Sequence, residues 1–370
     1  MDKMKKFIDV IVPVTTCTLR CHYCYITHKR LFGGVLPKFS YTADQFRQAL
    51  SQKRLGGVCM FNFCGGGETL LPPEVPTYIK ALLEEGHYVM VVTNATVDRA
   101  FDEFEKWPKE LLERLFFKFS YHYLELKGRN LFERFFRNIR RMRDAGASFT
   151  LEATPSDELV PYIDEMKEQS MREVGAWCHI SVPRYEHDFS EIPLLSKMTP
   201  DEFKRTWSVF DSAFFDYKFS VFGEKQSGFC HAGDWTGFLV MGTESCAFTQ
   251  CYCSMDSIDI FKNVSKPLKC HVVGHCCQIP HCFNAHAFLS FGAIAERNDP
   301  TYDILRNRVC ADGTEWLKPR MKEFMQQRLR DNNLPYSKLA RLRADLWMYT
   351  RKPLRIVRRI AGRAYHKIFG

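Results

Sequence analysis

Apolar and polar positions follow two alternating periods along the first 220 residues. Short apolar runs rich in β-branched and aromatic residues predict six strands, at 7–14, 57–63, 88–93, 116–122, 147–153 and 177–182. Segments with a helical period predict helices at 42–54, 74–86, 98–114, 129–145, 156–172 and 199–217. Strands that alternate with helices build parallel βαβ units. The pattern therefore predicts an α/β fold, a curved parallel sheet or partial barrel with its functional loops at the carboxyl ends of the strands.

The pattern changes after residue 220. Residues 221–292 have a weak helical period and many Gly, Cys and His residues, which predicts a small domain organised around metal. Residues 293–370 return to a helical pattern. The sequence therefore predicts three parts: a barrel over 1–220, a Cys-rich domain over 221–292 and a helical region over 293–370.

The formal net charge of +9 over 370 residues is concentrated at the end of the chain. Residues 328–370 contain twelve Lys or Arg and two acids, so the remainder is nearly neutral. Residues 351–370 have the period of a basic amphipathic helix, which fits an anionic membrane surface or, alternatively, packing on the body of the protein. No nucleic-acid-binding module accompanies the tail, so that class of partner is not expected.

The chain has no apolar run of the length that a transmembrane helix needs, and it has no secretory signal at its start. We therefore expect a cytoplasmic protein that could lie peripherally at the inner membrane face.

Fifteen cysteines are present, and three of them, Cys17, Cys21 and Cys24, follow the first predicted strand. Three thiolates on one short loop can hold three corners of a cubane iron–sulfur cluster and leave the fourth iron for a non-protein ligand. Zinc is the alternative, but a structural zinc site needs four protein ligands. His22 could be a fourth ligand, although its position beside Cys21 would strain the geometry.

A glycine-rich turn, Cys64-Gly-Gly-Gly-Glu-Thr, ends the second predicted strand. Its glycines would let the backbone approach a ligand closely, and Glu68 adds an acceptor for a cationic group. The turn follows the cysteine loop by one βα unit, as a shared ligand would require.

With these two motifs the sequence resembles the radical S-adenosylmethionine (SAM) superfamily. The family's CxxxCxΦC motif, in which Φ is aromatic, matches Cys17, Cys21, Tyr23 and Cys24, and its GGE motif matches Gly66, Gly67 and Glu68. The resemblance implies a partial (β/α)6 barrel and a [4Fe–4S] cluster on the three cysteines, with SAM bound to the fourth iron. Such a reduced cluster cleaves SAM to methionine and a 5′-deoxyadenosyl radical, which abstracts a substrate hydrogen. A reducing partner such as flavodoxin or ferredoxin is implied.

The same resemblance suggests which residues contact SAM. The GGE turn would receive the SAM amino group, Tyr23 would lie near the adenine, and polar residues at later strand ends would contact the ribose and carboxylate. The expected cofactor-binding residues are Tyr23, Gly65, Gly66, Gly67, Glu68, Asn94, Ser120, His122 and Arg184.

The Cys-rich part resembles the SPASM or twitch extensions of these enzymes, whose cysteines bind auxiliary [4Fe–4S] clusters. The sequence has G-x3-C where the usual form has G-x4-C, and CC-x4-C where it has C-x2-C-x5-C. One auxiliary cluster is expected, on Cys230, Cys246, Cys282 and either Cys276 or Cys277. A second auxiliary cluster, with Cys251, Cys253 and Cys270 among its ligands, is the alternative. Zinc held by these cysteines and nearby histidines, in a non-enzymatic protein, is the rival interpretation.

The substrate is expected to be a small molecule or glycan, a carbohydrate such as a nucleotide- or lipid-linked sugar, changed by epimerisation or oxidation. This expectation depends on the early first strand, which begins at Phe7 and leaves no room for a preceding peptide-recognition domain, and on the basic tail. A peptide or protein maturase that forms crosslinks or oxidised side chains is the alternative. An epimerase needs a hydrogen-atom donor, for which the candidates are Cys178, Cys251 and Cys253.

Overall fold

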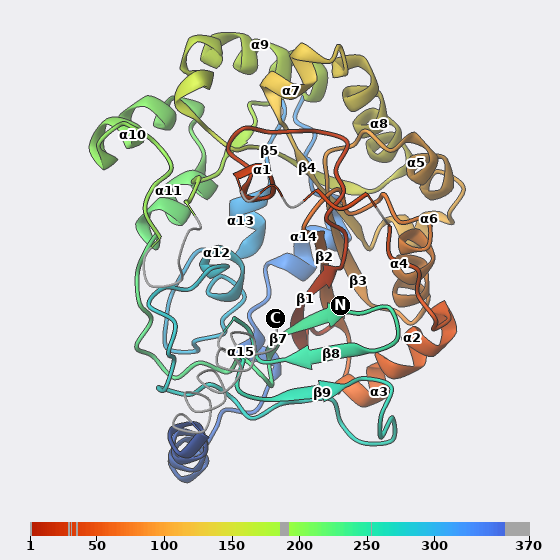
Figure 1. The fold of residues 1–370 in the computed structure, drawn as a ribbon, viewed down its shortest axis with the longest axis vertical. Helices are drawn as coiled ribbons and strands as arrows, with labels where there is room; N and C mark the ends of the chain where they lie inside the picture. Colours follow the sequence, from red (N-terminus) through yellow and green to blue (C-terminus); the bar gives the residue numbers. More distant parts are fainter. Residues whose placement is uncertain are drawn as a thin grey trace, which may run out of the picture.

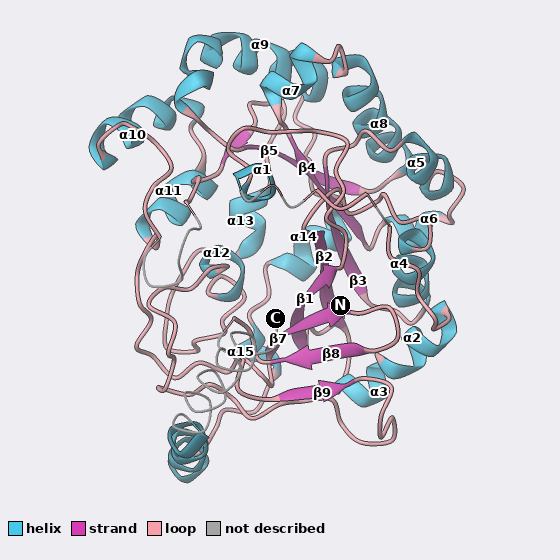
Figure 2. Ribbon diagram, viewed as in Figure 1, coloured by secondary structure: helices cyan, strands magenta, loops and turns pink. Residues whose placement is uncertain are grey.

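The computed structural model describes residues 2–28, 30, 32–34, 36–185, 192–252 and 254–351. Within these ranges one nine-stranded sheet has the order β6-β5-β4-β3-β2-β1-β7-β8-β9 (Figures 1 and 2). Its first six strands are parallel and adjacent in chain order, so the predicted α/β fold with a partial (β/α)6 barrel is confirmed. These strands are β1 (Lys6–Val12), β2 (Cys59–Gly65), β3 (Tyr88–Thr93), β4 (Leu115–Ser120), β5 (Ser148–Ala153) and β6 (His179–Ile180).

Nine α-helices of the described chain lie between β1 and β6 in chain order, and the longer ones cover the outer face of the sheet (Figure 1). They are α1 (Tyr25–His28), α2 (Ala43–Ala49), α3 (Gln52–Leu55), α4 (Val75–Glu84), α5 (Asp98–Phe104), α6 (Lys109–Leu112), α7 (Tyr123–Gly128), α8 (Phe132–Ala145) and α9 (Ile163–Val174), the last following the 3-10 helix η1 (Asp157–Tyr162). The helix predicted over 98–114 is two helices, because Pro108 lies between them. Thr42 begins α2 with a capping box that it forms with Gln45.

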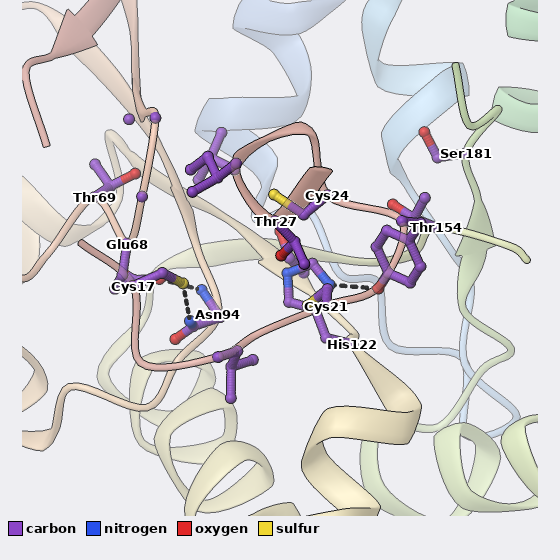
Figure 3. A pocket seen from close by; sticks show the side chains of 18 of the residues that line it. Cys17, Cys21, Cys24, Thr27, Glu68, Thr69, Asn94, His122, Thr154 and Ser181 are labelled. Atoms are coloured by element: carbon purple, nitrogen blue, oxygen red, sulfur yellow. Dashed lines mark hydrogen bonds between the residues drawn. The ribbon is translucent and has the colours of Figure 1, made fainter. Parts of the chain in front are cut away.

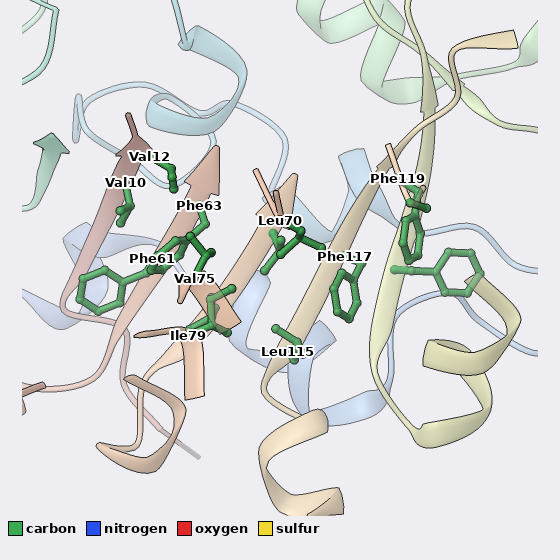
Figure 4. Close-up of a cluster of buried hydrophobic side chains, with 14 of the residues drawn as sticks. Val10, Val12, Phe61, Phe63, Leu70, Val75, Ile79, Leu115, Phe117 and Phe119 are labelled. Atoms are coloured by element: carbon green, nitrogen blue, oxygen red, sulfur yellow. The ribbon is translucent and has the colours of Figure 1, made fainter. Parts of the chain in front are cut away.

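Alternate residues of the strands face this helical layer and form the larger hydrophobic core (Figure 4). Phe61 and Phe63 of β2 pack there with Val75 and Ile79 of α4, and all four are fully buried. The intervening strand residues face the inside of the barrel. Both faces of the parallel sheet are therefore covered, which explains the nearly continuous apolar runs in the sequence.

The Cys-rich part shares the sheet of the barrel. Strand β7 (Thr236–Met241) pairs with β1 in parallel, and β8 (Cys246–Thr249) and β9 (Ser257–Asp259) continue the sheet in antiparallel fashion. The remaining labelled helices are α10 (Pro200–Trp207), the 3-10 helix η2 (Ser208–Phe210), α11 (Ala213–Ser220), α12 (Ala285–Phe288), α13 (Tyr302–Arg306), α14 (Pro319–Met325) and α15 (Leu329–Asn332). Residues 338–351 form a further helix, the C-terminal helix of the described chain.

Helix α14 closes the inside of the barrel. Its Met321, Phe324 and Met325 are buried in a second core with inward-facing strand residues such as Phe7. The rings of Tyr88 and Phe324 stack with centroids 3.7 Å apart. No helix in the described ranges is both long and apolar enough to cross a bilayer. Most of the predicted basic tail, residues 352–370, lies outside the described residues.

Candidate active site

The loop after β1 holds the three predicted cluster ligands, Cys17, Cys21 and Cys24. Its course is fixed by hydrogen bonds to the ends of neighbouring elements. The hydroxyl of Thr18 lies 2.7 Å from that of Thr96, just after β3. The backbone N–H of Arg20 donates to the Glu125 carboxylate on α7 over 2.7 Å. The protein chain itself therefore positions this loop.

The three thiols border one cavity of about 300 Å³ (Figure 3), and each is a free thiol. Burial, aided by the charges of Glu68 and Cys24, raises the pKa of the Cys17 thiol to about 11. Burial and the two neighbouring thiols raise the pKa of Cys21 further. Buried thiolates this close together need a positively charged partner. The donor set therefore fits a [4Fe–4S] cluster with three cysteine ligands.

The turn after β2 lies directly against the cysteine loop. The backbone N–H of Glu68 donates to the carbonyl of Thr16 over 3.0 Å. A Cβ atom on Gly67 would collide with that same carbonyl. Only glycine therefore allows the two segments to approach this closely. The glycine-rich motif and the three cysteines thus form one continuous wall.

The carboxylate of Glu68 is buried and joins the ends of β2 and β3. It accepts hydrogen bonds from the Thr93 hydroxyl (2.6 Å), the Asn94 N–H (2.8 Å) and the Leu70 N–H (3.1 Å). Burial raises its pKa, and these hydrogen bonds oppose the rise. The sequence predicts Glu68 as an acceptor for a cationic group. The structure adds a positioning role, because the same carboxylate fixes the residue that follows β3.

Two side chains at strand ends contact the cysteine loop. The amide nitrogen of Asn94 lies 3.6 Å from the Cys17 sulfur and donates to the Thr18 hydroxyl over 2.9 Å. The Nδ1 atom of His122 lies 2.7 Å from the Tyr23 hydroxyl (Figure 3). Burial lowers the pKa of His122 to about 4, so its ring is neutral near pH 7. These contacts link β3 and β4 to the cluster motif.

All nine predicted SAM-contact residues line this cavity: Tyr23, Gly65, Gly66, Gly67, Glu68, Asn94, Ser120, His122 and Arg184. Their contact with SAM stays a prediction. The opposite wall holds residues that the sequence did not single out, among them Thr154, Ser181 and Lys218 (Figure 3 labels the first two). Thr154 and Ser181 lie at the ends of predicted strands, a position that could have indicated them. Lys218 lies on α11 and carries no motif that would have done so.

A second cavity is lined by four cysteines from three loop segments, Cys230, Cys251, and Cys277 with Cys282. Cys276 packs beside them and donates to the Asp345 carbonyl over 3.5 Å. The structure does not bring the predicted ligand Cys246 to this group. Cys246 lies on β8, fully buried against the helix-covered core, with its sulfur 3.2 Å from the Tyr41 hydroxyl. The alternation of side chains along β8 turns it to that face.

The other predicted cysteines are separate from both cavities or are not described. Cys178 is fully buried in the large core and does not line the first cavity. The Cys270 sulfur lies 3.6 Å from the Phe248 carbonyl, in the same core. Cys253 lies outside the described residues.

No three His, Cys, Asp or Glu side chains of the described chain converge closely enough to hold a single metal ion. A cubane places its thiolate ligands at separate corners, so its cysteines lie further apart than around one ion. The assignment of either cysteine group as a set of cluster ligands stays a prediction.

Comparison with known proteins agrees with this site. Residues 11–154 match the family model of the Radical SAM superfamily. The chain therefore contains a radical SAM domain, and the resemblance drawn from the two motifs is confirmed. The cofactors of such a domain are a [4Fe–4S] cluster and SAM, and Cys17, Cys21, Cys24 and the adjoining turn fit them. No curated protein matches the chain.

Solved structures resemble this chain at low identity, and the first of them shares its fold. Streptococcus suis SuiB bound to S-adenosylmethionine has a TM-score of 0.50 and 13% identity, over 70% of this chain and 65% of SuiB. Native anSMEcpe with bound AdoMet and the Cp18Cys peptide has a TM-score of 0.44 and 14% identity, over 79% and 81% of the two chains. BtrN in complex with AdoMet and 2-DOIA has a TM-score of 0.29 and 10% identity, over 90% and 92%. The chain thus spans less than two thirds of SuiB, with which it shares its fold.

Proposed function

We propose that this protein is a radical SAM enzyme that abstracts a hydrogen atom from a polar small-molecule substrate. One observation carries the proposal: the cysteine loop, the GGE turn and the predicted strand-end residues all border one cavity at the carboxyl ends of the barrel strands. When bound, the reduced cluster and SAM supply a 5′-deoxyadenosyl radical for hydrogen abstraction.

The residues of the chain hold and shield the cofactors. Cys17, Cys21 and Cys24 would bind three irons, and the turn at Gly66–Glu68 would receive the SAM amino group. Asn94 keeps the Cys17 side of the loop in place, and the Tyr23–His122 contact fixes the aromatic ring beside the cluster. Because these groups are hydrogen-bonded to the chain, the site is preorganised, and little rearrangement is needed when the cofactors bind.

The second cysteine group is proposed as an auxiliary [4Fe–4S] site of the SPASM or twitch type. Its ligands would be Cys230, Cys251, Cys277 and Cys282, because these four border one cavity. Cys251 would thereby replace Cys246 in the predicted ligand set. Of the adjacent pair, Cys277 lines the cavity and Cys276 does not, which favours Cys277 as the ligand.

We propose a carbohydrate or another hydroxyl-bearing compound as the substrate. Support comes from the wall opposite the cysteine loop, where Thr154, Ser181, Arg184 and Lys218 offer hydrogen-bonding groups. Epimerisation or two-electron oxidation at a carbinol carbon would be the reaction. A low-potential donor such as flavodoxin or ferredoxin would deliver the electron that SAM cleavage consumes.

A membrane surface is proposed as the place of action. In the described helix over 338–351, Leu339, Leu342, Leu346 and Tyr349 are exposed. Basic residues flank them and continue into the tail. An exposed apolar row with flanking basic charge suits an anionic bilayer surface. Flotation with phosphatidylglycerol vesicles would test this, and retention equal to that on phosphatidylcholine vesicles would contradict it.

Anaerobic reconstitution with iron and sulfide tests the central proposal. With dithionite and SAM, we expect 5′-deoxyadenosine and methionine in equal amounts, detected by mass spectrometry, and none from Cys17→Ala. Carbon-deuterated nucleotide sugars then test the substrate class. Oxidation would move deuterium into 5′-deoxyadenosine, whereas epimerisation would in addition exchange the substrate hydrogen with solvent. Deuterium transfer from a peptide alone would contradict the carbohydrate assignment.

A further inference from the structure

Three residues of the first cavity, Val182, Arg184 and Lys218, also line a smaller cavity whose walls include His286, Cys282 and Phe283. Cys282 and Phe283 in turn line the cavity of the second cysteine group. The cavities beside the two cysteine groups thus share lining residues with one smaller cavity, and we call the wall formed by Lys218 and Arg184 the junction. A substrate between the two groups would meet these two cations.

The interior of the barrel beside this junction has more cations than anions. Glu152 of β5 pairs with Lys118 of β4 over 3.1 Å and with Arg306 of α13 over 2.6 Å. The Glu152 carboxylate is almost fully buried and is shared by both partners. It is also the acid whose charge acts on Lys218. One carboxylate therefore faces three cations, and it forms ion pairs with two of them, Lys118 and Arg306.

Of these three cations, Lys218 is the one that does not form an ion pair with Glu152 in the described chain. Its ammonium donates to the Ser181 hydroxyl, and this is its one hydrogen bond within the part of the chain that the structure describes. Loss of solvent and the nearby charges of Lys118, Arg184 and Arg306 lower its pKa to about 7. An ammonium that is desolvated without a carboxylate partner costs free energy. Such a group is stabilised when an anion binds beside it.

Arg184 lines the first cavity and also the smaller cavity at the junction. Its guanidinium donates to the Phe283 carbonyl over 3.0 Å and lies over the Phe283 ring at 5.3 Å. Its predicted contact with SAM stays a prediction. The contacts with Phe283 place its guanidinium beside the smaller cavity. A guanidinium and an ammonium on one wall form the donor pair that phosphate groups prefer.

We propose that Lys218 and Arg184 form an anion subsite that binds a phosphate group of the substrate. This inference rests on the proposed function, since it assigns the substrate class of the same cavity. The substrate would then be a phosphorylated or diphosphate-linked compound. Its phosphate would lie at the junction, and its reacting carbon would point back toward the cysteine loop.

Titration calorimetry on the reconstituted, SAM-saturated holoenzyme tests the subsite, with inorganic phosphate as the probe. Phosphate should bind the wild type, and Lys218→Met should weaken that binding by about tenfold or more. Lys218→Arg should restore binding to within about threefold, because the charge is kept. The control Lys322→Met, which removes a lysine paired with Glu315 far along the chain, should leave phosphate affinity unchanged.

Thermal unfolding provides a second measurement, and it also shows whether the variants fold. Without phosphate, Lys218→Met should be at least as stable as the wild type, because a desolvated charge is removed. Phosphate should raise the melting temperature of the wild type and not that of Lys218→Met. Acetate binding as tight as phosphate would overturn the phosphate class, and no binding of either anion would overturn the subsite.

The affinity for SAM separates this inference from the proposed function. In phosphate-free buffer the SAM dissociation constant of Lys218→Met should stay within about twofold of the wild type, because the subsite lies beyond the cysteine loop. A parallel loss of SAM affinity would overturn the proposal and assign the cation to the SAM carboxylate. Phosphate binding without any SAM cleavage would refute the proposed function alone. SAM cleavage without phosphate binding would refute the subsite alone.

Discussion

The two cysteine groups of this protein are built in different ways. In the first group, hydrogen bonds from Thr96, Glu125 and Asn94 position the loop that follows β1, so the chain fixes the site before any metal binds. In the second group, Cys230 precedes β7, Cys251 lies between β8 and β9, and Cys277 and Cys282 lie between β9 and α12, where regular structure is sparse. Backbone hydrogen bonds between Cys230 and Gly274 and between Ala232 and Val273 join these segments. Neighbouring strand ends therefore position the first group, whereas pairing between distant loop segments positions the second.

The largest expected effect is in the first group. Replacement of Cys24 by alanine should lower 5′-deoxyadenosine formation by about a thousandfold or more, because one iron loses its protein ligand. The melting temperature of the apoprotein should stay close to that of the wild type, since the loop is held by other contacts. Cys310→Ala, a thiol bonded to the Val174 carbonyl outside both cavities, is the matched control. Equal activity in Cys24→Ala and the control would rule out the proposed cluster site.

The barrel should be stable without bound metal, and its free energy of unfolding should fall at acid pH. His87 is fully buried; its Nδ1 accepts the Cys59 N–H and its Nε2 lies 2.9 Å from the Leu50 carbonyl. Burial lowers its pKa from 6.5 to about 4. Between pH 4 and pH 6.5, His87 therefore binds a proton more readily in the unfolded chain than in the folded one. The contribution of neutral His87 to the free energy of unfolding is fully present above pH 6.5, and it falls by about 3 kcal/mol as the pH falls to 4.

Denaturant unfolding of the apoprotein at pH 7 and pH 4.5 measures this loss. The variant His87→Gln keeps a donor and an acceptor but cannot titrate, so its stability should depend less steeply on pH than that of the wild type. The difference between the two proteins is the quantity to compare, because other groups titrate in both. Identical pH slopes would show that the strand ends of the barrel do not hold His87 neutral.

The next effect is the loss of one whole cluster, and it tests the ligands of the second group. Cys251→Ser should lower the iron content of reconstituted protein from about eight to about four per chain, if each group holds one cubane. Cys246→Ser should leave the iron content unchanged, because that thiol lies in the core against Tyr41. The opposite result would return Cys246 to the ligand set and remove Cys251.

Cys246 and Cys251 also show which features of the fold the sequence does not predict. Hydrophobic periods located all six parallel strands, and β3 was placed at its observed bounds of Tyr88–Thr93. Side chains at strand ends follow from that order alone, which is why the predicted residues of the first site share one cavity. The orientation of Cys246 depends instead on the pairing of β8 with β7 and β9, which cysteine spacing does not contain.

Other features were missed because they arise from contacts between distant segments. Helix α14 has a polar sequence overall, yet three of its residues fill the barrel. Lys218 lies in an ordinary helix, and only the fold brings it to the wall opposite the cysteine loop. The helix predicted over 156–172 begins later, at Ile163, because Pro161 falls within the preceding 3-10 turn. Local periodicity thus predicted the strands and helices of the barrel, whereas the residues on the substrate side of the cavity are brought together only by tertiary structure.

The smallest effect refines the account of the first group. Tyr23→Phe keeps the aromatic ring of the cluster motif and removes the hydroxyl, which contacts His122 and the Cys21 thiol. A hydrogen bond of this kind contributes about 1 kcal/mol, so SAM affinity should fall by about fivefold while the iron content stays the same. Tyr121→Phe is the matched control, because its hydroxyl bonds to Gln169 away from the cavity. Equilibrium dialysis with labelled SAM measures both variants. If Tyr23→Phe lost iron instead, the hydroxyl would serve the cluster through Cys21, and the loop would need this contact to hold its metal.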